Sequence, residues 1–189
     1  MEELIHFFDK YVDLTTVEIS FIKSNVELRT VNKNVILLKE GDCSNEFYFV
    51  VEGCLRLYYL NNTEEKTAYF YTENMFASSY QSFTKRIPAT HNLAAVEDSK
   101  LVVFDLESVL KFTEFSTKFN FLARVIMEDE LGTYQEIISS FITQNAEQRY
   151  LQLLKKRPTL IQRIPQHQIA TFLGVAPETL SRIRSRIMK

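Results

Sequence analysis

Apolar residues recur along this chain in three different patterns, and each pattern predicts a different kind of element. Near the start they fall at helical intervals, from Leu4 through Phe7, Phe8 and Tyr11. This spacing predicts one or two short helices between Leu4 and Val31.

A second pattern consists of short runs rich in Val, Ile, Phe and Tyr, over residues 34–41, 46–61, 66–72 and 100–106. Turn-forming residues separate the runs, at Gly41-Asp42, Gly53, Asn61-Asn62, Glu73-Asn74 and Asp98-Ser99. Runs of this length and composition are typical of strands. Their regular spacing predicts a sandwich or a barrel-like jelly roll.

After Phe104 the apolar period changes to about 3.6 residues and predicts a long helix from about Ser116 to Ile142. Along it, apolar positions are three, four and three residues apart, at Leu131, Tyr134, Ile138 and Phe141. This spacing resembles a coiled-coil seam, although packing against the β-domain would give the same stripe. The length of about seven turns favours a dimer helix.

The segment from Pro165 to Ile187 carries the most specific pattern. A first helix begins at Pro165, Gly174 supplies a tight turn, and Pro177 starts a second helix. Ala170, Gly174 and Leu180 have the spacing of a helix-turn-helix, in which a small residue lets the helices approach and a leucine fills the space between them. The second helix then presents an acid-poor polar face made of Glu178, Thr179, Ser181, Arg182, Ser185 and Arg186.

The formal net charge of −2 conceals a strong asymmetry. From Arg149 to the end there are nine basic residues and one acidic residue, whereas the remainder has 13 basic and 23 acidic residues. A basic segment of this kind favours a polyanion such as DNA as its partner. A solvated basic helix face is the alternative if charge is considered alone.

The composition gives no support for a membrane, metal, cofactor or catalytic role. No apolar run is long enough to span a bilayer and no secretory signal is visible, so we expect a cytoplasmic protein. Cys43 and Cys54 are expected to be buried, and they are too few for an iron–sulfur or zinc site. With no H-x-H pair, Ser-His-Asp set or phosphate-binding glycine loop, we expect no metal, no cofactor and no enzyme activity.

Taken together, the chain resembles the Crp/Fnr family of transcription regulators over nearly its whole length. The similarity lies in three blocks, EGDCSNEFYFVVEGCLRLYYL, HNLAAVEDSKLVVFD and RYLQLLKKRPTLIQRIPQHQIATFLGVAPETLSRIR. It implies an α+β fold with an N-terminal jelly-roll (double-stranded β-helix) sensor domain over residues 1–115. A long connecting dimer helix over 116–145 and a helix-turn-helix DNA-binding domain over 146–189 would follow.

By this resemblance the protein is a homodimer that binds double-stranded DNA at a two-fold-symmetric operator. Glu178 and Arg182 match the Glu and Arg that read base edges in the family, whereas Pro177 replaces another base-reading Arg. We expect phosphate contacts or packing from Thr179, Ser181, Arg184 and Arg186, and phosphate contacts from Gln166 and His167. No winged hairpin is expected, so the motif would depend for its core on Tyr150, Leu153, Leu154 and Leu160.

The sequence departs from the family where cyclic AMP binds. Cyclic-AMP-binding members have a Gly-Glu pair for the ribose and an Arg for the cyclic phosphate. Here the pair is missing around Phe76 to Ser79, Ala89 replaces the Arg, and Arg86 is three residues out of register. We expect a degenerate effector pocket, with an unknown effector that is not cyclic AMP. Its candidate lining residues are Phe76, Ser78, Ser79, Arg86 and Thr90.

Two other classes of protein fit parts of the sequence. One is a β-roll that binds a small molecule or a protein and whose C-terminal helices do not bind DNA. The other is an enzyme built on a jelly roll. The strongly basic C-terminal segment argues against both.

Overall fold

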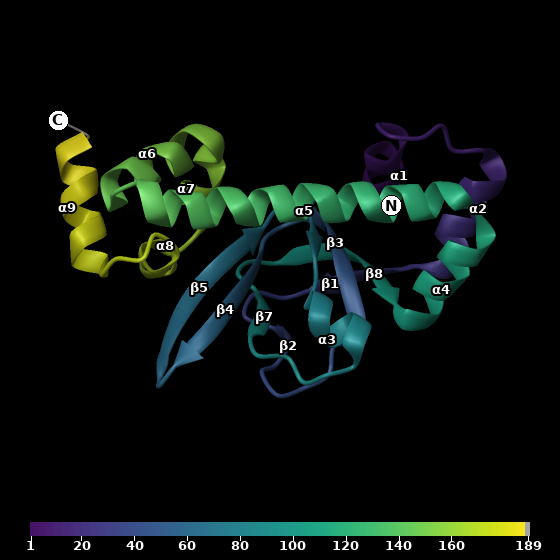
Figure 1. The fold of residues 1–189 in the computed structure, drawn as a ribbon, viewed down its shortest axis with the longest axis horizontal. Helices are drawn as coiled ribbons and strands as arrows, with labels where there is room; N and C mark the ends of the chain where they lie inside the picture. Colours follow the sequence, from purple (N-terminus) through teal and green to yellow (C-terminus); the bar gives the residue numbers. More distant parts are fainter. Residues whose placement is uncertain (188–189) are drawn as a thin grey trace. The chain divides into compact units, whose positions relative to one another are not determined.

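The computed structural model describes residues 1–187 (Figure 1). The last two residues of the expected DNA-binding domain lie outside the described part of the chain. The chain forms two compact units, each described by itself below. Unit 1 comprises Met1–Leu57 and Phe70–Glu128, and unit 2 comprises Tyr58–Tyr69 and the residues from Asp129 onward.

Unit 1 begins with two helices, α1 (Glu2–Asp9) and α2 (Thr16–Asn25), as the apolar spacing predicts. The predicted helical region is wrong at its end, because residues 27–31 form the strand β1 (Glu27–Val31). β1 pairs antiparallel with β8 (Ser99–Asp105) over all five of its residues. Since strand preference depends on such pairing more than on local sequence, the apolar intervals alone could not show it.

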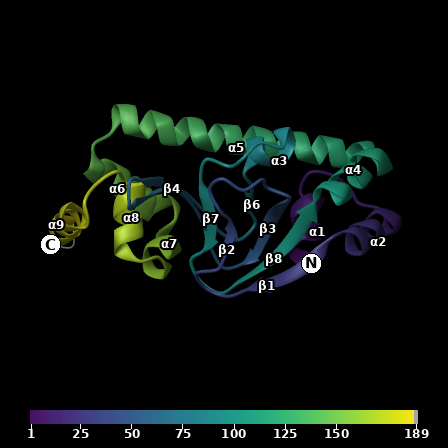
Figure 2. The same ribbon diagram turned by 90° about the horizontal axis from the view of Figure 1, so that it is seen from below.

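Within residues 1–187, eight strands form two four-stranded sheets in a jelly-roll-like arrangement. Besides β1 and β8 they are β2 (Ile36–Leu38), β3 (Glu46–Glu52), β4 (Leu55–Asn61), β5 (Glu64–Tyr71), β6 (Phe76–Ala77) and β7 (Asn92–Ala95). The strand orders are β1-β8-β3-β6 and β2-β7-β4-β5, and Figure 2 shows β1, β8 and β3 side by side. The antiparallel roll confirms the fold class expected for the first part of the chain.

An aromatic core fixes one face of the β3–β8 pair. Phe49 and Phe104 pack with Phe8 of α1, Phe112 of α4 (Leu106–Phe115) and Phe119 of α5 (Thr117–Thr143). All five rings are less than 8% exposed. Burying each one contributes about 2 to 3 kcal/mol, so this cluster holds the helices on the sheet.

The turn at Gly53 brings two backbone segments into close contact. Gly53 has a φ of +103°, and a Cβ atom there would lie 2.2 Å from the Oγ atom of Ser99. That hydroxyl accepts a hydrogen bond from the backbone N–H of Cys54 at 3.2 Å. Cys54 is buried as expected, but the same expectation is wrong for Cys43, which is exposed in the loop that follows β2.

Unit 2 contains the second part of α5 and four shorter helices, α6 (Ala146–Lys156), α7 (Pro158–Arg163), α8 (Gln166–Phe172) and α9 (Pro177–Ile187). The predicted long helix is confirmed, with both ends one residue later than expected. The expected boundary at 115/116 falls at the end of α4, and the one at 145/146 falls two residues after the end of α5, directly before α6. The division between the two units falls elsewhere, within α5 after Glu128, so the expected domain boundaries stay a prediction. Residues Tyr58–Tyr69, from the β4–β5 hairpin, nevertheless belong to unit 2.

A buried carboxylate joins α2 to the start of α5 within unit 1. Glu18 is 7% exposed and accepts hydrogen bonds from the Thr15 backbone N–H, the Lys118 Nζ and the Ser116 hydroxyl, each at 2.9 Å. The hydrogen bond from Lys118, followed by that from Thr15, lowers the pKa of Glu18 from 4.5 to about 2. The folded state therefore holds this carboxylate ionised well into acid.

We predict that Glu18→Gln lowers the unfolding free energy at pH 7 by about 2 kcal/mol, because the ionised carboxylate accepts charge-assisted hydrogen bonds. A carboxyl pKa that is depressed on folding stabilises fully above 4.5, and the contribution disappears as the pH falls toward 2. Urea denaturation at several pH values between 7 and 2.5 should show the difference between variant and wild type shrinking in acid. Glu52→Gln, which removes an exposed ion pair with Lys100, should change stability by less than about 1 kcal/mol. A pH-independent deficit in the Glu18 variant would contradict the assignment.

Candidate functional site

The most distinctive local arrangement in unit 2 is the C-terminal helix pair, defined as α8, α9 and the turn between them. The turn ends α8 at Leu173, passes through Gly174 with a φ of +70°, and returns a hydrogen bond from the Val175 N–H to the Ala170 carbonyl at 3.0 Å. Pro177 begins α9 in the first-turn position, where its missing N–H costs nothing.

The spacing identified in the sequence has the packing expected of it. Ala170 is fully buried and Leu180 is 1% exposed, which is consistent with close helix approach and with a leucine filling the space between the helices. Gly174 is required for a second reason besides the tight turn. A Cβ atom there would lie 2.8 Å from Phe141 of α5, so the steric conflict is with α5.

Burial of Leu180 and Ile183 fixes which face of α9 is exposed. The outward side chains are Glu178, Thr179, Ser181, Arg182, Ser185 and Arg186, as predicted, while Arg184 is half-buried. Gln166 and His167 are exposed at the start of α8. The structure thus places all eight predicted DNA-contact residues on the C-terminal helix pair, seven of them exposed.

The charged residues of α9 differ in whether they form ion pairs. Arg186 forms an ion pair with Glu147 of α6 at 3.3 Å. Glu178 and Arg182, one helical turn apart, form no ion pair with each other or with any other described residue. Among residues 1–187, no acidic group therefore compensates the exposed guanidinium of Arg182.

The side chains of α6 and α7 that were expected to form the core of the motif differ in burial. Tyr150, Leu153 and Leu160 are buried as expected, at 5%, 7% and 1% exposure. Leu154 is 38% exposed, so its predicted core role is wrong. It follows the buried Leu153 directly and so points about 100° away from it around the helix.

The apolar stripe predicted on α5 divides between two faces. Leu131 and Ile138 are about 60% exposed, and Ile142 one turn further is 78% exposed. Tyr134 instead packs edge-on against Tyr69 of the hairpin, and Phe141 lies under the Arg149 guanidinium. The residues at this spacing therefore lie on two faces of α5, one exposed to solvent and one packed within unit 2.

The candidate effector residues in unit 1 occupy different environments. Phe76 packs among aromatic rings that include Phe7 and Phe49, Ser79 is buried before α3 (Tyr80–Lys85), Ser78 is half-buried, and Thr90 is exposed. Arg86 donates hydrogen bonds to the Ser44 carbonyl and to the Asn45 side chain. Its guanidinium is thus directed at the 41–45 loop.

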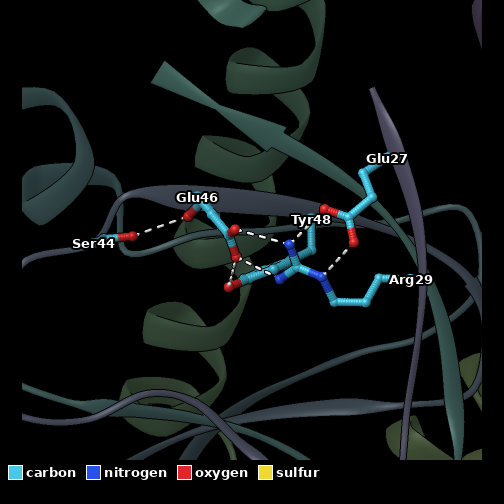
Figure 3. Close-up of polar contacts among 5 residues, drawn as sticks. All are labelled: Glu27, Arg29, Ser44, Glu46 and Tyr48. Atoms are coloured by element: carbon cyan, nitrogen blue, oxygen red, sulfur yellow. Dashed lines mark hydrogen bonds and ion pairs between the residues drawn. The ribbon is translucent and has the colours of Figure 1, made fainter. Parts of the chain in front are cut away.

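A second arginine of unit 1 lies between two carboxylates (Figure 3). Arg29 donates to both oxygens of Glu27 at 2.7 and 2.8 Å and to both oxygens of Glu46 at 2.8 and 3.0 Å, while the Tyr48 hydroxyl also donates to Glu46. The bonds with Glu27, then with Glu46, raise the pKa of Arg29, and the bond from Arg29 lowers the pKa of Glu46. Burial raises the pKa of Tyr48, followed by the effect of the Glu46 charge. Glu46 and Tyr48 also line a hollow of about 540 Å³ beside β2.

Within residues 1–187, no group of three His, Cys, Asp or Glu side chains is placed to hold a metal ion. Among the helices in this part of the chain, none has the length and apolar character needed to cross a membrane.

Comparison with known proteins identifies the fold. Residues 28–114 match the family model described as the cyclic nucleotide-binding domain. No curated protein matches the sequence.

Similar solved structures cover most of the chain. FixK2 from Bradyrhizobium japonicum is 16% identical, has a TM-score of 0.73, and aligns over 86% of this chain and 84% of its own. A putative transcriptional regulator of the Crp/Fnr family from Eubacterium rectale is 20% identical, with a TM-score of 0.73 and coverage of 97% and 88%. The catabolite activator protein of Thermus thermophilus is 18% identical, with a TM-score of 0.58 and coverage of 94% and 85%. The chain therefore shares the fold of Crp/Fnr-type regulators.

Sequence reasoning missed the part played by Arg149, which it counted with the basic residues favouring DNA. The structure shows its side chain bonded to backbone carbonyls in the turn of the helix pair and at the end of α5. No local sequence signal distinguishes this arginine from a solvent-exposed one.

We predict that Gly174→Ala destabilises unit 2 by about 2 kcal/mol, because a positive φ and a contact of 2.8 Å with Phe141 both oppose a Cβ atom. The matched control is Gly132→Ala in α5, where a Cβ atom would meet nothing within 4 Å. That change should stabilise the protein by about 1 kcal/mol through helix propensity. Chemical denaturation followed by circular dichroism measures both effects, and equal effects of the two changes would contradict the turn geometry.

Proposed function

We propose that this protein is a DNA-binding transcription regulator of the Crp/Fnr type, in which the C-terminal helix pair is a helix-turn-helix and α9 is its recognition helix. The observation that carries the proposal is the exposed, acid-poor face of α9, on which Arg182 has no ion-pair partner among the described residues. Helices of this kind fit the major groove. The similarity in fold to known regulators supports the same function.

The contacts divide by chemistry into base-reading and phosphate-binding groups. Arg182 suits the O6 and N7 atoms of guanine, and Glu178 can accept a hydrogen bond from cytosine N4. The hydroxyls of Thr179 and Ser181 and the side chains of Arg184, Gln166 and His167 suit phosphate. Arg186 can add to this group if it leaves Glu147.

In this proposal, the protein acts as a homodimer that forms through α5. Leu131, Ile138 and Ile142 form an exposed apolar seam along the second part of that helix. Such a seam is suited to pairing with the same seam of a second copy. A symmetric dimer would present two recognition helices to an operator whose half-sites are related by two-fold symmetry.

The proposed sensor pocket does not take cyclic AMP as the best-known family members do. Ala89 stands at the position of the phosphate-binding Arg, and its backbone is bonded to Gly41 and Asp42. The nearby guanidinium of Arg86 holds the 41–45 loop, and that of Arg29 is paired with two carboxylates. In the proposed mechanism, an unidentified effector that occupies the roll shifts the long helices of the dimer and reorients its recognition helices.

We expect the wild-type protein to enrich a two-fold-symmetric sequence from a random duplex library, with binding that weakens as salt rises. Arg182→Ala should lose about tenfold to a hundredfold in affinity for that sequence and relax its preference at one base pair in each half-site. Fluorescence anisotropy across single-base variants of the selected duplex measures the change.

Lys155→Ala is the matched control, because Lys155 is an exposed cation of α6 outside the recognition helix. It should leave the sequence preference unchanged. If the wild type enriches no sequence and binds no duplex at low salt, the regulator assignment is wrong, and an interaction module becomes the better account.

We also expect Ile138→Glu to convert a dimer into a monomer, because it places a charge in the exposed seam of each copy. Leu60→Glu is the control, since Leu60 is similarly exposed, at 48%, but lies on the β4–β5 hairpin. Sedimentation equilibrium should show the wild type and the Leu60 variant as dimers. A dimer that survives the Ile138 change would place the interface elsewhere.

A further inference from the structure

The side chain of Arg149 joins three segments of unit 2. It lies in the first turn of α6, whose start is fixed by reciprocal hydrogen bonds between Asn145 and Gln148. Its Nε and Nη2 atoms donate to the Leu173 carbonyl at 3.2 and 2.8 Å, and its Nη1 atom donates to the Gln144 carbonyl at 2.6 Å. Arg149 therefore connects the end of α5, the start of α6 and the turn between α8 and α9.

Both carbonyls lie at helix C-termini, where backbone oxygens lack partners within the helix and carry the negative end of the helix dipole. Leu173 is the C-cap of α8, and Gln144 follows the last residue of α5. A planar guanidinium can bond both carbonyls at once while its face packs on a ring. Here that ring belongs to Phe141, with its centroid 4.5 Å away.

The surrounding packing leaves room for movement. An open hollow of about 120 Å³ adjoins the contact, and its lining includes Ile137, Phe141, Leu153 and Phe172 as well as Arg149. Because apolar packing around this joint is incomplete, the hydrogen bonds of Arg149 are the specific polar link between the end of α5 and the turn of the helix pair.

We infer that Arg149 is a positioning residue that fixes the orientation of α9 relative to α5, and thereby sets the half-site spacing that the dimer prefers. The inference rests on the proposed function and adds the residue that sets operator geometry. Arg149 itself contacts no DNA in this scheme, because its polar atoms face the protein backbone. In a two-fold dimer, a change in that angle moves the two recognition helices in opposite directions, so half-site separation is the quantity most affected.

The experiment uses the full chain and the duplex selected by the wild type, rebuilt with its half-sites moved apart or together one base pair at a time around about one helical turn. The wild type should prefer one spacing by about tenfold over its neighbours two base pairs away. In Arg149→Ala this preference should fall to about twofold, while the base preference within each half-site stays unchanged.

Two further variants separate the possible causes. Arg149→Lys keeps the charge but replaces the three nitrogens of the planar fork with one, so it should flatten the spacing profile in the same way. It decides the question if the alanine variant does not fold. Lys155→Ala removes a charge from the same helix and should keep the wild-type profile.

A sharp wild-type optimum in either folded Arg149 variant would overturn the inference. Failure of the wild type to select any paired half-sites would instead overturn the proposed function.

Discussion

The burial of Leu180 and Ile183 determines what the C-terminal part of this chain presents to solvent. Because these two residues lie on one side of α9, the opposite side carries only polar and charged groups. Rotating the helix would bury Arg182 or expose Leu180, and either change costs several kcal/mol. The polar face of α9 is thus a consequence of core packing rather than of any specific surface interaction.

Arginines in this protein have two different uses, and their surroundings distinguish them. Arg29, Arg86 and Arg149 each donate hydrogen bonds to carboxylates or backbone oxygens, so their guanidinium groups are engaged within their own unit. Arg182, by contrast, forms no ion pair with any described residue. The basic excess of the C-terminal segment nevertheless overstates the charge available to a polyanion, because Lys156 and Arg186 form ion pairs with Glu136 and Glu147.

The sequence was sufficient for features that depend on local pattern. Strands β2, β3, β4, β5 and β8, the long helix and the α8–α9 spacing follow from periodicity, turn residues and residue size, whereas β6 and β7 lie outside the predicted runs. It was insufficient where a partner distant in the chain decides the outcome. β1 needs β8, Arg149 needs Leu173, and the apolar positions of α5 divide only because Tyr69 and the helix pair occupy one side of it. The exposure of Cys43 and Leu154 has the same origin, since apolar character alone does not specify which side chains find neighbours.

The pairing of Arg29 with Glu27 and Glu46 has a further consequence for the chemistry that this end of the roll can accept. Three formal charges are present, and they sum to −1 because two carboxylates share one guanidinium. Lys39 and Asp42, which also line the adjoining hollow, carry opposite charges, so an anion entering it would still meet net negative charge. A neutral or cationic molecule would not meet this repulsion. At this end of the roll, the charge network therefore disfavours anions.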